Sequence, residues 1–161
     1  MSAALPEPLI RLRPMAEMDL RQVLEIEGHA YGFPWPMGIF RDCLRVGYCC
    51  WVVECHGRIE AYGVMSVAPS EAHLLNLCVR QACQRLGFGR MLLRHLMELA
   101  LERRADTMFL EVRPSNHAAL KLYESMGFNA AGIRRGYYPT LHRREDALIL
   151  ACHIGIAVTD P

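Results

Sequence analysis

A glycine-rich stretch between two apolar segments is the first feature of this sequence that could bind a ligand. It reads QRLGFG over residues 84–89, and a helical pattern begins at about the same place. Glycine lets the backbone approach a ligand closely, and the free amides of a helix N-terminus attract anions. The stretch lacks the third glycine of a dinucleotide fingerprint and the Gly-Lys-Ser/Thr ending of a P-loop. Taken alone it is equally consistent with a plain turn and with a phosphate cradle, to which Arg85 and Arg90 would add charge.

A carboxylate further along the chain could transfer protons. Glu111 lies in the apolar segment TMFLEVR, where strand alternation places it on one face with Phe109 and Arg113. Burial would raise the pKa of this carboxyl group, and a nearby cation would lower it. The segment is compatible with two interpretations, a catalytic base and a surface ion pair between Glu111 and Arg113.

Tyr123 and Asn116 belong to the next helical pattern. Tyr123 shares its apolar face with Ala119, Leu122 and Met126, so its ring is expected to point inward and its hydroxyl to need a polar partner. Periodicity alone favours a core tyrosine. Asn116 is expected to cap the N-terminus of this helix.

The elements that position these residues are predicted by hydrophobic periodicity. Strands are expected over Leu9–Arg13, CCWVVEC, RIEAYGVMSV, HLLNLCV, Thr107–Arg113, Ala131–Tyr138 and Asp146–His153, with turns at His56-Gly57 and APSEA and a polar loop PTLHRRE. Helices are expected over MAEMDLRQVLEIEGHAY, Met37–Val46, Gly87–Arg104 and NHAALKLYESMGF, the last ended by Gly127. Apolar stripes are expected at Met18, Val23, Ile26 and Ala30 in the first helix, and at Phe88, Met91, Leu92, Leu96, Leu99 and Ala100 in the third. The pattern predicts an α/β (α+β) fold with a mostly antiparallel sheet of about six to seven strands flanked by about four helices.

Length and composition favour one domain over residues 1–161, with an ordered core at about 9–154 and disorder at residues 1–8 and about the last five. A formal charge of +1 gives no overall field for nucleic acid, and no apolar run reaches the ~18 residues of a membrane span. The N-terminus lacks the pattern of a signal peptide, so a cytoplasmic location is expected. The seven cysteines include no CxxC pair and are expected to stay reduced. No metal is expected, because ligand spacing is lacking among His73, His95 and His117.

Several motifs in a fixed order resemble the GNAT superfamily of acetyl-CoA-dependent N-acetyltransferases. They are Q-x-x-G-x-G at the start of a long helix, the strand LLNLCV before it, and N-x-x-A-x-x-L-Y-x-x-x-G-F over residues 116–128. The resemblance covers about Leu9 to Ile154 and implies that the co-substrate is acetyl-CoA. It implies pyrophosphate binding by Arg85, Leu86, Gly87, Phe88, Gly89 and Arg90, pairing of the pantetheine arm with Leu77, Cys78 and Val79, and a coenzyme A contact for Asn116.

The same resemblance implies roles in catalysis for two residues. Glu111 matches the general base of the family, and Tyr123 matches the proton donor to the departing thiolate. An unperturbed phenol has a pKa of ~10, above the ~8.5 of a thiol, so Tyr123 can keep its proton until the thiolate forms.

A closer resemblance concerns the acceptor. The blocks LEVRPSNHAALKLYESMGF, IRRGYYP and REDALIL, with FPW at residues 33–35, are similar to the RimI-type enzymes that acetylate the N-terminal alanine of ribosomal small-subunit protein eighteen. They imply that the partner is the N-terminal tail of a ribosomal protein. An N-terminal amine with a pKa of ~8 is about one-tenth neutral at pH 7, whereas a lysine amine is neutral less than about one time in a thousand. The loop LHRRED departs from the pattern, which predicts a changed peptide preference if it borders the acceptor.

Other interpretations accompany these predictions. The protein could act on a lysine or a small-molecule amine, could be a coenzyme A-binding module without catalysis, or could bind RNA. Cys78 could relay the acyl group, although its apolar strand favours a packed thiol. Either a peptide slot or ordinary turn and core packing would account for Phe33, Pro34, Trp35, Tyr137 and Tyr138. An acidic partner, RNA or solvent could face the basic cluster Arg134, Arg135, His142, Arg143 and Arg144.

Overall fold

A seven-stranded sheet forms the centre of the computed structural model, which describes residues 9–155. The expected disordered ends lie outside these residues. The spatial order of the strands is β1-β2-β3-β4-β5-β7-β6. Their bounds are β1 Ile10–Pro14, β2 Cys49–Cys55, β3 Arg58–Ala68, β4 Ser70–Val79, β5 Ala105–Val112, β6 Asn129–Pro139 and β7 Arg144–His153. Every neighbouring pair is antiparallel except β4 and β5, which are parallel. The predicted mixed, mostly antiparallel sheet is confirmed.

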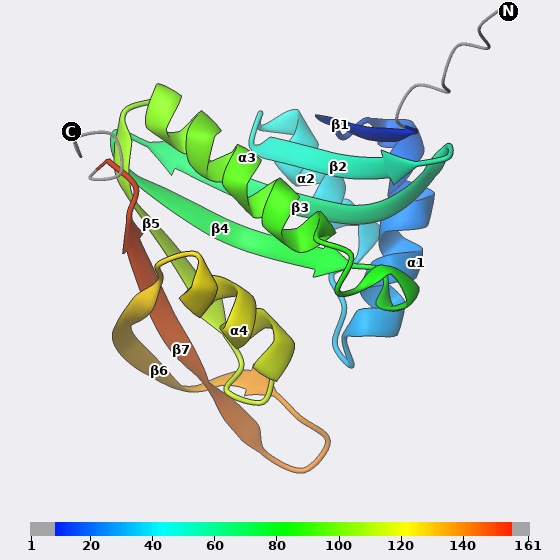
Figure 1. Cartoon of the computed structure of the whole chain (residues 1–161). Coiled ribbons are helices and arrows are strands. Elements are labelled where there is room, and N and C mark those ends of the chain that lie inside the picture. Colours follow the sequence, from blue (N-terminus) through cyan, green and yellow to red (C-terminus); the bar gives the residue numbers. More distant parts are fainter. Residues whose placement is uncertain (1–8, 156–161) are drawn as a thin grey trace, which may run out of the picture.

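Helices cover both faces of this sheet (Figure 1). On one face lie α3 (Phe88–Glu102) and α4 (His117–Ser125), and on the other lie α1 (Leu20–Ala30) and α2 (Met37–Arg45). Two single 3-10 turns, Glu17–Asp19 and Gln81–Cys83, precede α1 and α3. Within the described residues, no helix combines the length and apolarity that crossing a membrane requires.

The two faces of the sheet carry separate hydrophobic cores, because successive side chains of a strand point to opposite sides. In β2, Cys50 and Val52 pack into the core beneath α1 and α2. Cys49 and Val53, which alternate with them, pack into the core beneath α3 and α4. The central strands are therefore buried on both faces of the sheet.

The connections follow the predicted turn chemistry. His56 and Gly57 both have positive φ, +52° and +79°, as the two-residue turn of a hairpin requires. Gly127 ends α4 with a φ of +95°. The parallel pair β4 and β5 needs a crossover, and α3 supplies it.

Some element details differ from the predictions. Met18 precedes α1 and is 84% exposed, and Ala30 is exposed, so the predicted stripe of the first helix is wrong at both ends. The face of α1 that packs on the sheet instead begins at Leu20 and includes Glu27. In α3, Leu93 is buried while Met91 stays exposed. The β3–β4 turn is shorter than APSEA, and the closing strands reach further into the loop that joins them, because backbone pairing continues past the apolar residues.

Candidate active site

The sheet opens where β4 and β5 separate. The two strands pair only from Ser70 and Ala105 to Leu74 and Leu110. On its other edge β4 stays paired with β3 as far as Val79. The β3–β4 register shifts between Leu74 and Asn76, and a β-bulge of this kind bends the strand that carries the extra residue. The second half of β4 therefore has a strand neighbour on one side only.

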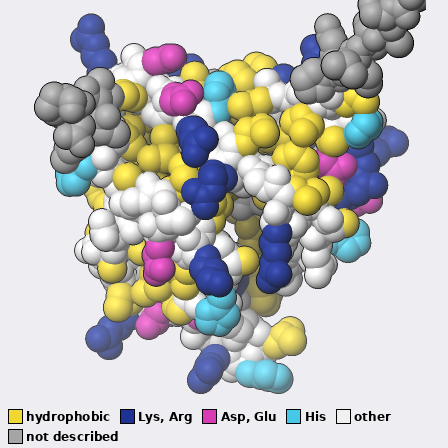
Figure 2. Space-filling view, viewed as in Figure 1, with side chains coloured by type: hydrophobic (Ala, Val, Ile, Leu, Met, Phe, Trp, Pro, Cys, Tyr) yellow, Lys and Arg dark blue, Asp and Glu magenta, His cyan; other side chains and the backbone are white. Residues whose placement is uncertain are grey.

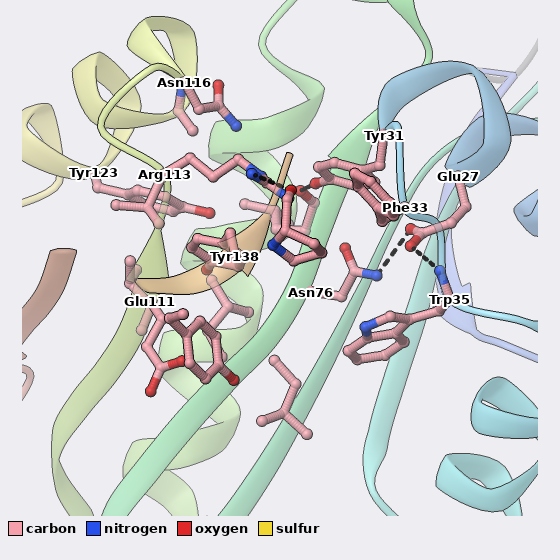
Figure 3. A pocket seen from close by; sticks show the side chains of 18 residues that line it. Glu27, Tyr31, Phe33, Trp35, Asn76, Glu111, Arg113, Asn116, Tyr123 and Tyr138 are labelled. Atoms are coloured by element: carbon pink, nitrogen blue, oxygen red, sulfur yellow. Dashed lines mark hydrogen bonds between the residues drawn. The ribbon is translucent and has the colours of Figure 1, made fainter. Parts of the chain in front are cut away.

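A cavity of about 480 Å³ lies at this opening (Figure 3). Its walls come from α1 and the segment after it, from β4 and β5, from α4 and from β6. Among the residues predicted for the site, those that line the cavity are Leu77, Glu111, Asn116 and Tyr123. The others, Cys78, Val79 and residues 85–90, continue from its edge along β4 and into the loop before α3.

Tyr123 is buried, and its ring packs edge-on to Phe128 with centroids 5.7 Å apart. Figure 3 shows its hydroxyl pointing into the cavity. Burial is the main cause that raises the pKa of Tyr123 above its ordinary value of 10.0. A group with a raised pKa stays protonated at neutral pH, so Tyr123 can act as a proton donor here.

Glu111 is paired with a different arginine from the one expected. Its carboxylate lies 3.0 Å from the guanidinium of Arg134 on β6, and this guanidinium also lies over the ring of Tyr137. Arg113 instead pairs with Glu145 at 3.3 Å. The interpretation of Glu111 and Arg113 as a surface ion pair, one of the two that the sequence left open, is therefore wrong.

Arg113 anchors the β6–β7 hairpin to β5. Both of its terminal nitrogens donate to the carbonyl of Pro139 at 3.3 Å, and its guanidinium lies 4.4 Å from the centre of the Tyr138 ring. Burial is the largest cause that raises the pKa of Tyr138 to about 12. Arg113 thus fixes an aromatic side chain in the wall of the cavity.

Cys78 has the properties of a packed thiol. It is 7% exposed and belongs to the core beneath α1 and α2. Burial is the main cause that raises the pKa of the Cys78 thiol to about 11, so it is neutral at physiological pH. A thiolate is the nucleophilic form of cysteine, and this environment disfavours it.

The glycine-rich loop presents backbone amides to solvent. Arg85 and Gly87 both have positive φ, +70° and +87°, and Gly87 is the N-cap of α3. The first helical bond runs from the amide of Met91 to the carbonyl of Gly87 at 3.0 Å, so the amides ahead of Met91 have no helix carbonyl to bond. This arrangement provides donors and a positive dipole end for an anion.

The neighbouring residues of this loop have packing roles as well. A Cβ at Gly89 would lie 3.2 Å from Leu122 on α4 and 3.4 Å from Val79, so glycine permits close approach of the two helices. Phe88 is buried in the core, which leaves only its amide for a ligand. Arg90 donates to the hydroxyl of Ser125 at 2.8 Å and so ties α3 to α4.

Basic side chains gather on this face of the molecule (Figure 2). They lie over α3, α4 and the loop between β4 and α3, whose exposed cations are Arg85, Arg90, Arg94 and Lys121. The overall charge of +1 conceals this local concentration. The same face carries the free amides of α3, so charge and hydrogen-bond donors favour the same kind of ligand, an anion.

Asn116 serves as the helix cap, with its side chain accepting from the amide of Ala119 at 3.2 Å. Asn116 also lines the cavity, so a ligand bound there could contact it. Among residues 9–155, no group of three or more His, Cys, Asp or Glu side chains is arranged to hold a metal ion.

Sequence reasoning missed the polar floor of the cavity. Glu27 on α1 and Asn76 on β4 are both buried and hydrogen-bonded to one another at 2.9 Å, and Tyr31 donates to the carbonyl of Leu77 at 3.4 Å. The available signal was a glutamate next to Ile26, on the face of α1 that Leu20 and Val23 define. A carboxylate at such a position indicates a buried, hydrogen-bonded group.

Comparison with known proteins shows the family of the chain. A model described as the acetyltransferase (GNAT) family matches residues 20–128. The chain belongs to this family. The predicted acetyl-CoA-dependent N-acetyltransferase and the GNAT-like fold are thereby confirmed.

Several curated relatives carry the name [ribosomal protein bS18]-alanine N-acetyltransferase, among them two from enteric bacteria. The protein from Escherichia coli (strain K12) is 43% identical over 138 residues, which are 86% of this chain and 93% of the relative. The protein from Salmonella typhimurium is 42% identical over 142 residues, 88% of this chain and 96% of the relative. The crystal structure of the E. coli ribosomal-protein-S18-alanine N-acetyltransferase matches with a TM-score of 0.83 at 41% identity, covering 90% of this chain and 94% of that one. The GNAT chain described here is thus similar to enzymes of one named activity over most of its length.

Proposed function

We propose that this GNAT acetyltransferase transfers the acetyl group of acetyl-CoA to the N-terminal alanine of the ribosomal protein bS18. One GNAT domain spanning residues 1–161 would carry the activity. The reaction class rests on one observation, that Glu111 and Tyr123 line the cavity where β4 leaves β5. The choice of acceptor is supported by the names of relatives more than 40% identical over most of the chain.

The shape of the opening fits acetyl-CoA. The pantetheine arm carries amides that can pair with a strand edge, and β4 from Leu77 to Val79 lacks a β5 neighbour. The pyrophosphate is an anion, and the loop from Arg85 to Arg90 offers helix amides beside exposed arginines. Asn116 lines the cavity and caps α4, where it could contact coenzyme A. The residues that would hold the cofactor thus form one path along β4 to the start of α3.

Transfer is proposed to be direct. Glu111 takes a proton from the acceptor ammonium, a backbone amide of β4 near Cys78 donates a hydrogen bond to the thioester carbonyl, and Tyr123 gives its proton to the departing thiolate. A bond forms between the amine nitrogen and the acetyl carbon, and the bond between this carbon and sulfur breaks. The raised pKa of Tyr123, caused mainly by burial, suits a group that must stay protonated until the thiolate appears.

Glu111 must leave Arg134 in order to act. The Arg134 side chain is 56% exposed, and such surface pairs contribute only about 0–1 kcal/mol. An ammonium entering the cavity can therefore compete for the carboxylate at small cost. Arg134 in this proposal holds the Glu111 carboxylate in an ion pair until the acceptor arrives.

The acceptor side of the cavity has aromatic walls. Phe33 and Trp35 follow α1, and Tyr137 and Tyr138 lie on β6 across from them. These walls suit a peptide terminus whose first side chain is small. An N-terminal amine is about one-tenth neutral at pH 7, so a modest base such as Glu111 is enough to activate it.

Two peptides test the proposal. The first begins with alanine and carries a free amine, and the second is identical but is blocked at its amine and contains an added lysine. We expect the purified protein with acetyl-CoA to acetylate the first and not the second. Acetylation of the second peptide alone would assign the protein to lysine acetylation, and acetylation of neither would reject the proposed acceptor. Mass spectrometry of small-subunit ribosomal proteins with and without this gene extends the test to the cell.

A further inference from the structure

A buried glutamate ties the acceptor side of the cavity to the strand that borders the cofactor side. Glu27 is 2% exposed and lies on the third turn of α1. Its Oε2 accepts from the backbone amide of Trp35 at 2.9 Å, and its Oε1 accepts from the side-chain amide of Asn76 at 2.9 Å. Figure 3 shows both bonds converging on this carboxylate from opposite sides. The hydroxyl of Tyr62 on β3 also donates to Oε1.

All three donors are neutral, so the carboxylate is stabilised by hydrogen bonds alone. A buried carboxylate without a cation is costly unless its oxygens accept hydrogen bonds, and both oxygens of Glu27 do so. Removing the carboxylate would leave the amides of Trp35 and Asn76 without their acceptor. An apolar side chain would pack more simply at this position. The presence of a carboxylate here therefore indicates that it places the Trp35 backbone and the Asn76 side chain precisely.

The segment that Glu27 holds is the loop between α1 and α2. The loop FPWP over residues 33–36 connects α1 to α2, and Phe33 in it is 48% exposed. The ring of Trp35 packs on Phe40 of α2 with centroids 5.3 Å apart. The bond from Glu27 to the amide of Trp35, with that from Asn76 to Glu27, links the backbone of this loop to β4, beside the bond from Tyr31 to the carbonyl of Leu77.

From this geometry we infer that Glu27 is a positioning residue for the acceptor. It sets the distance between the wall formed by Phe33 and Trp35 and the floor formed by Asn76 on β4. The inference rests on the proposed function, because it assumes that a peptide terminus occupies this side of the cavity. Glu27 acts through the loop and takes no part in proton transfer, since both of its oxygens are already occupied.

Three variants of the full-length protein test this role. Glu27→Met keeps the length of the side chain and removes every acceptor. Glu27→Gln is the conservative variant. Its carbonyl oxygen can accept from the amide of Trp35, and its NH₂ group faces the Tyr62 hydroxyl and the Asn76 side-chain amide, which can rotate to accept from it. Tyr62→Phe is the matched control, since it removes a bond to the same carboxylate from a residue outside the cavity wall. Steady-state kinetics with the alanine peptide and calorimetric titration with acetyl-CoA are measured for each.

We expect Glu27→Met to raise the peptide KM by about tenfold or more, because one hydrogen bond to a charged group is enough to change an equilibrium constant tenfold. Its kcat and its Kd for acetyl-CoA should change less than about threefold. Glu27→Gln should recover most of the peptide KM, and Tyr62→Phe should keep it. An unchanged peptide KM in Glu27→Met, or an equal rise in Tyr62→Phe, overturns the inference.

Two measurements keep the test decisive. If the wild-type protein does not acetylate the alanine peptide, the proposed function fails. If the wild type is active but Glu27→Met has an unchanged peptide KM, or Tyr62→Phe shows an equal rise, only the role of Glu27 is rejected. If Glu27→Met does not melt cooperatively, hydrogen exchange at the Trp35 amide is compared between the wild type and Glu27→Gln, in which we expect both the peptide KM and this exchange to stay close to the wild type. The inference then requires that any rise of the peptide KM in Glu27→Gln be matched by faster exchange at the Trp35 amide, and a raised KM with unchanged exchange contradicts it.

Discussion

Replacing Tyr123 by phenylalanine removes one hydroxyl and leaves the packing of the ring intact. The contact with Phe128 involves the ring alone, and the hydroxyl faces the cavity with no hydrogen-bond partner among residues 9–155. No buried hydrogen bond is lost, so we expect a melting temperature within about 2 °C of the wild type. If Tyr123 protonates the thiolate, kcat should fall by about 10²–10⁴-fold, equivalent to roughly 2.7–5.4 kcal/mol in the barrier.

The assay follows release of the coenzyme A thiol with a chromogenic reagent and acetylation of the alanine peptide by mass. Acetyl-CoA binding is measured separately, since a loss of affinity would raise the KM for acetyl-CoA and leave kcat unchanged. Because burial raises the pKa of Tyr123, the wild-type kcat should also show no fall below about pH 9 from ionisation of this phenol. A kcat within about tenfold of the wild type in a stable Tyr123→Phe protein would falsify the proton-donor role.

Tyr62→Phe makes the same chemical change with the opposite consequence. The Tyr62 hydroxyl is buried and donates to the Glu27 carboxylate. Loss of a hydrogen bond to a charged group costs about 1.5–3 kcal/mol, which lowers the melting temperature of a protein of this size by roughly 3–12 °C. Its kcat should stay within about threefold of the wild type. The pair separates a hydroxyl that serves catalysis from one that serves stability.

Three further predictions concern the rest of the site. Glu111→Gln should lower kcat/KM for the alanine peptide by about 10²–10⁴-fold while acetyl-CoA still binds, and near-normal turnover would remove Glu111 from the mechanism. Gly87→Ala places a side chain at a φ of +87°, at a cost of about 1–2 kcal/mol, so the melting temperature should fall by roughly 2–8 °C, with weaker acetyl-CoA binding as the additional sign of a pyrophosphate site. The Cys78 thiol titrates near its ordinary value of 9.0 in the unfolded chain and near 11 in the folded protein, mainly because of burial. Stability should therefore fall as the pH rises from 9 to 11, by less in Cys78→Ala, and mass spectrometry should find no acetyl group on Cys78 during turnover.

Local patterns were sufficient for most of the elements. The alternation in Thr107–Arg113, the cap at Asn116 and the terminator at Gly127 depend on neighbours a few residues away, and each lies as predicted. The ordered motifs of the superfamily then supplied the global arrangement. What periodicity could not fix was the exact face of α1, because an exposed Met18 and a buried Glu27 both depart from a simple apolar stripe.

The partner of Glu111 was unpredictable for a different reason. Arg113 is two residues away on the same face of the strand, which makes it the natural partner in a local interpretation. The sheet order places β7 between β5 and β6, and Arg134 reaches Glu111 across this intervening strand. Arg113 is meanwhile engaged by Glu145 and Pro139 of the hairpin. Pairing of this kind is decided by strand order and hairpin register, which short-range spacing does not contain.

The site lies where β4 and β5 stop pairing in the middle of the sheet. A parallel pair in the middle of a sheet would ordinarily stay hydrogen-bonded along its length, since a buried backbone group without a partner costs about 1–3 kcal/mol. Here β4 bends away after Leu74, with cores packed on both of its faces. Around this opening Tyr31 donates to the backbone carbonyl of Leu77 and Asn76 donates to the Glu27 carboxylate, and a cavity remains between the strands. Such an opening is favourable only if water or a ligand satisfies the strand edge, so the feature that weakens the sheet is the same feature that lets an extended cofactor arm bind in it.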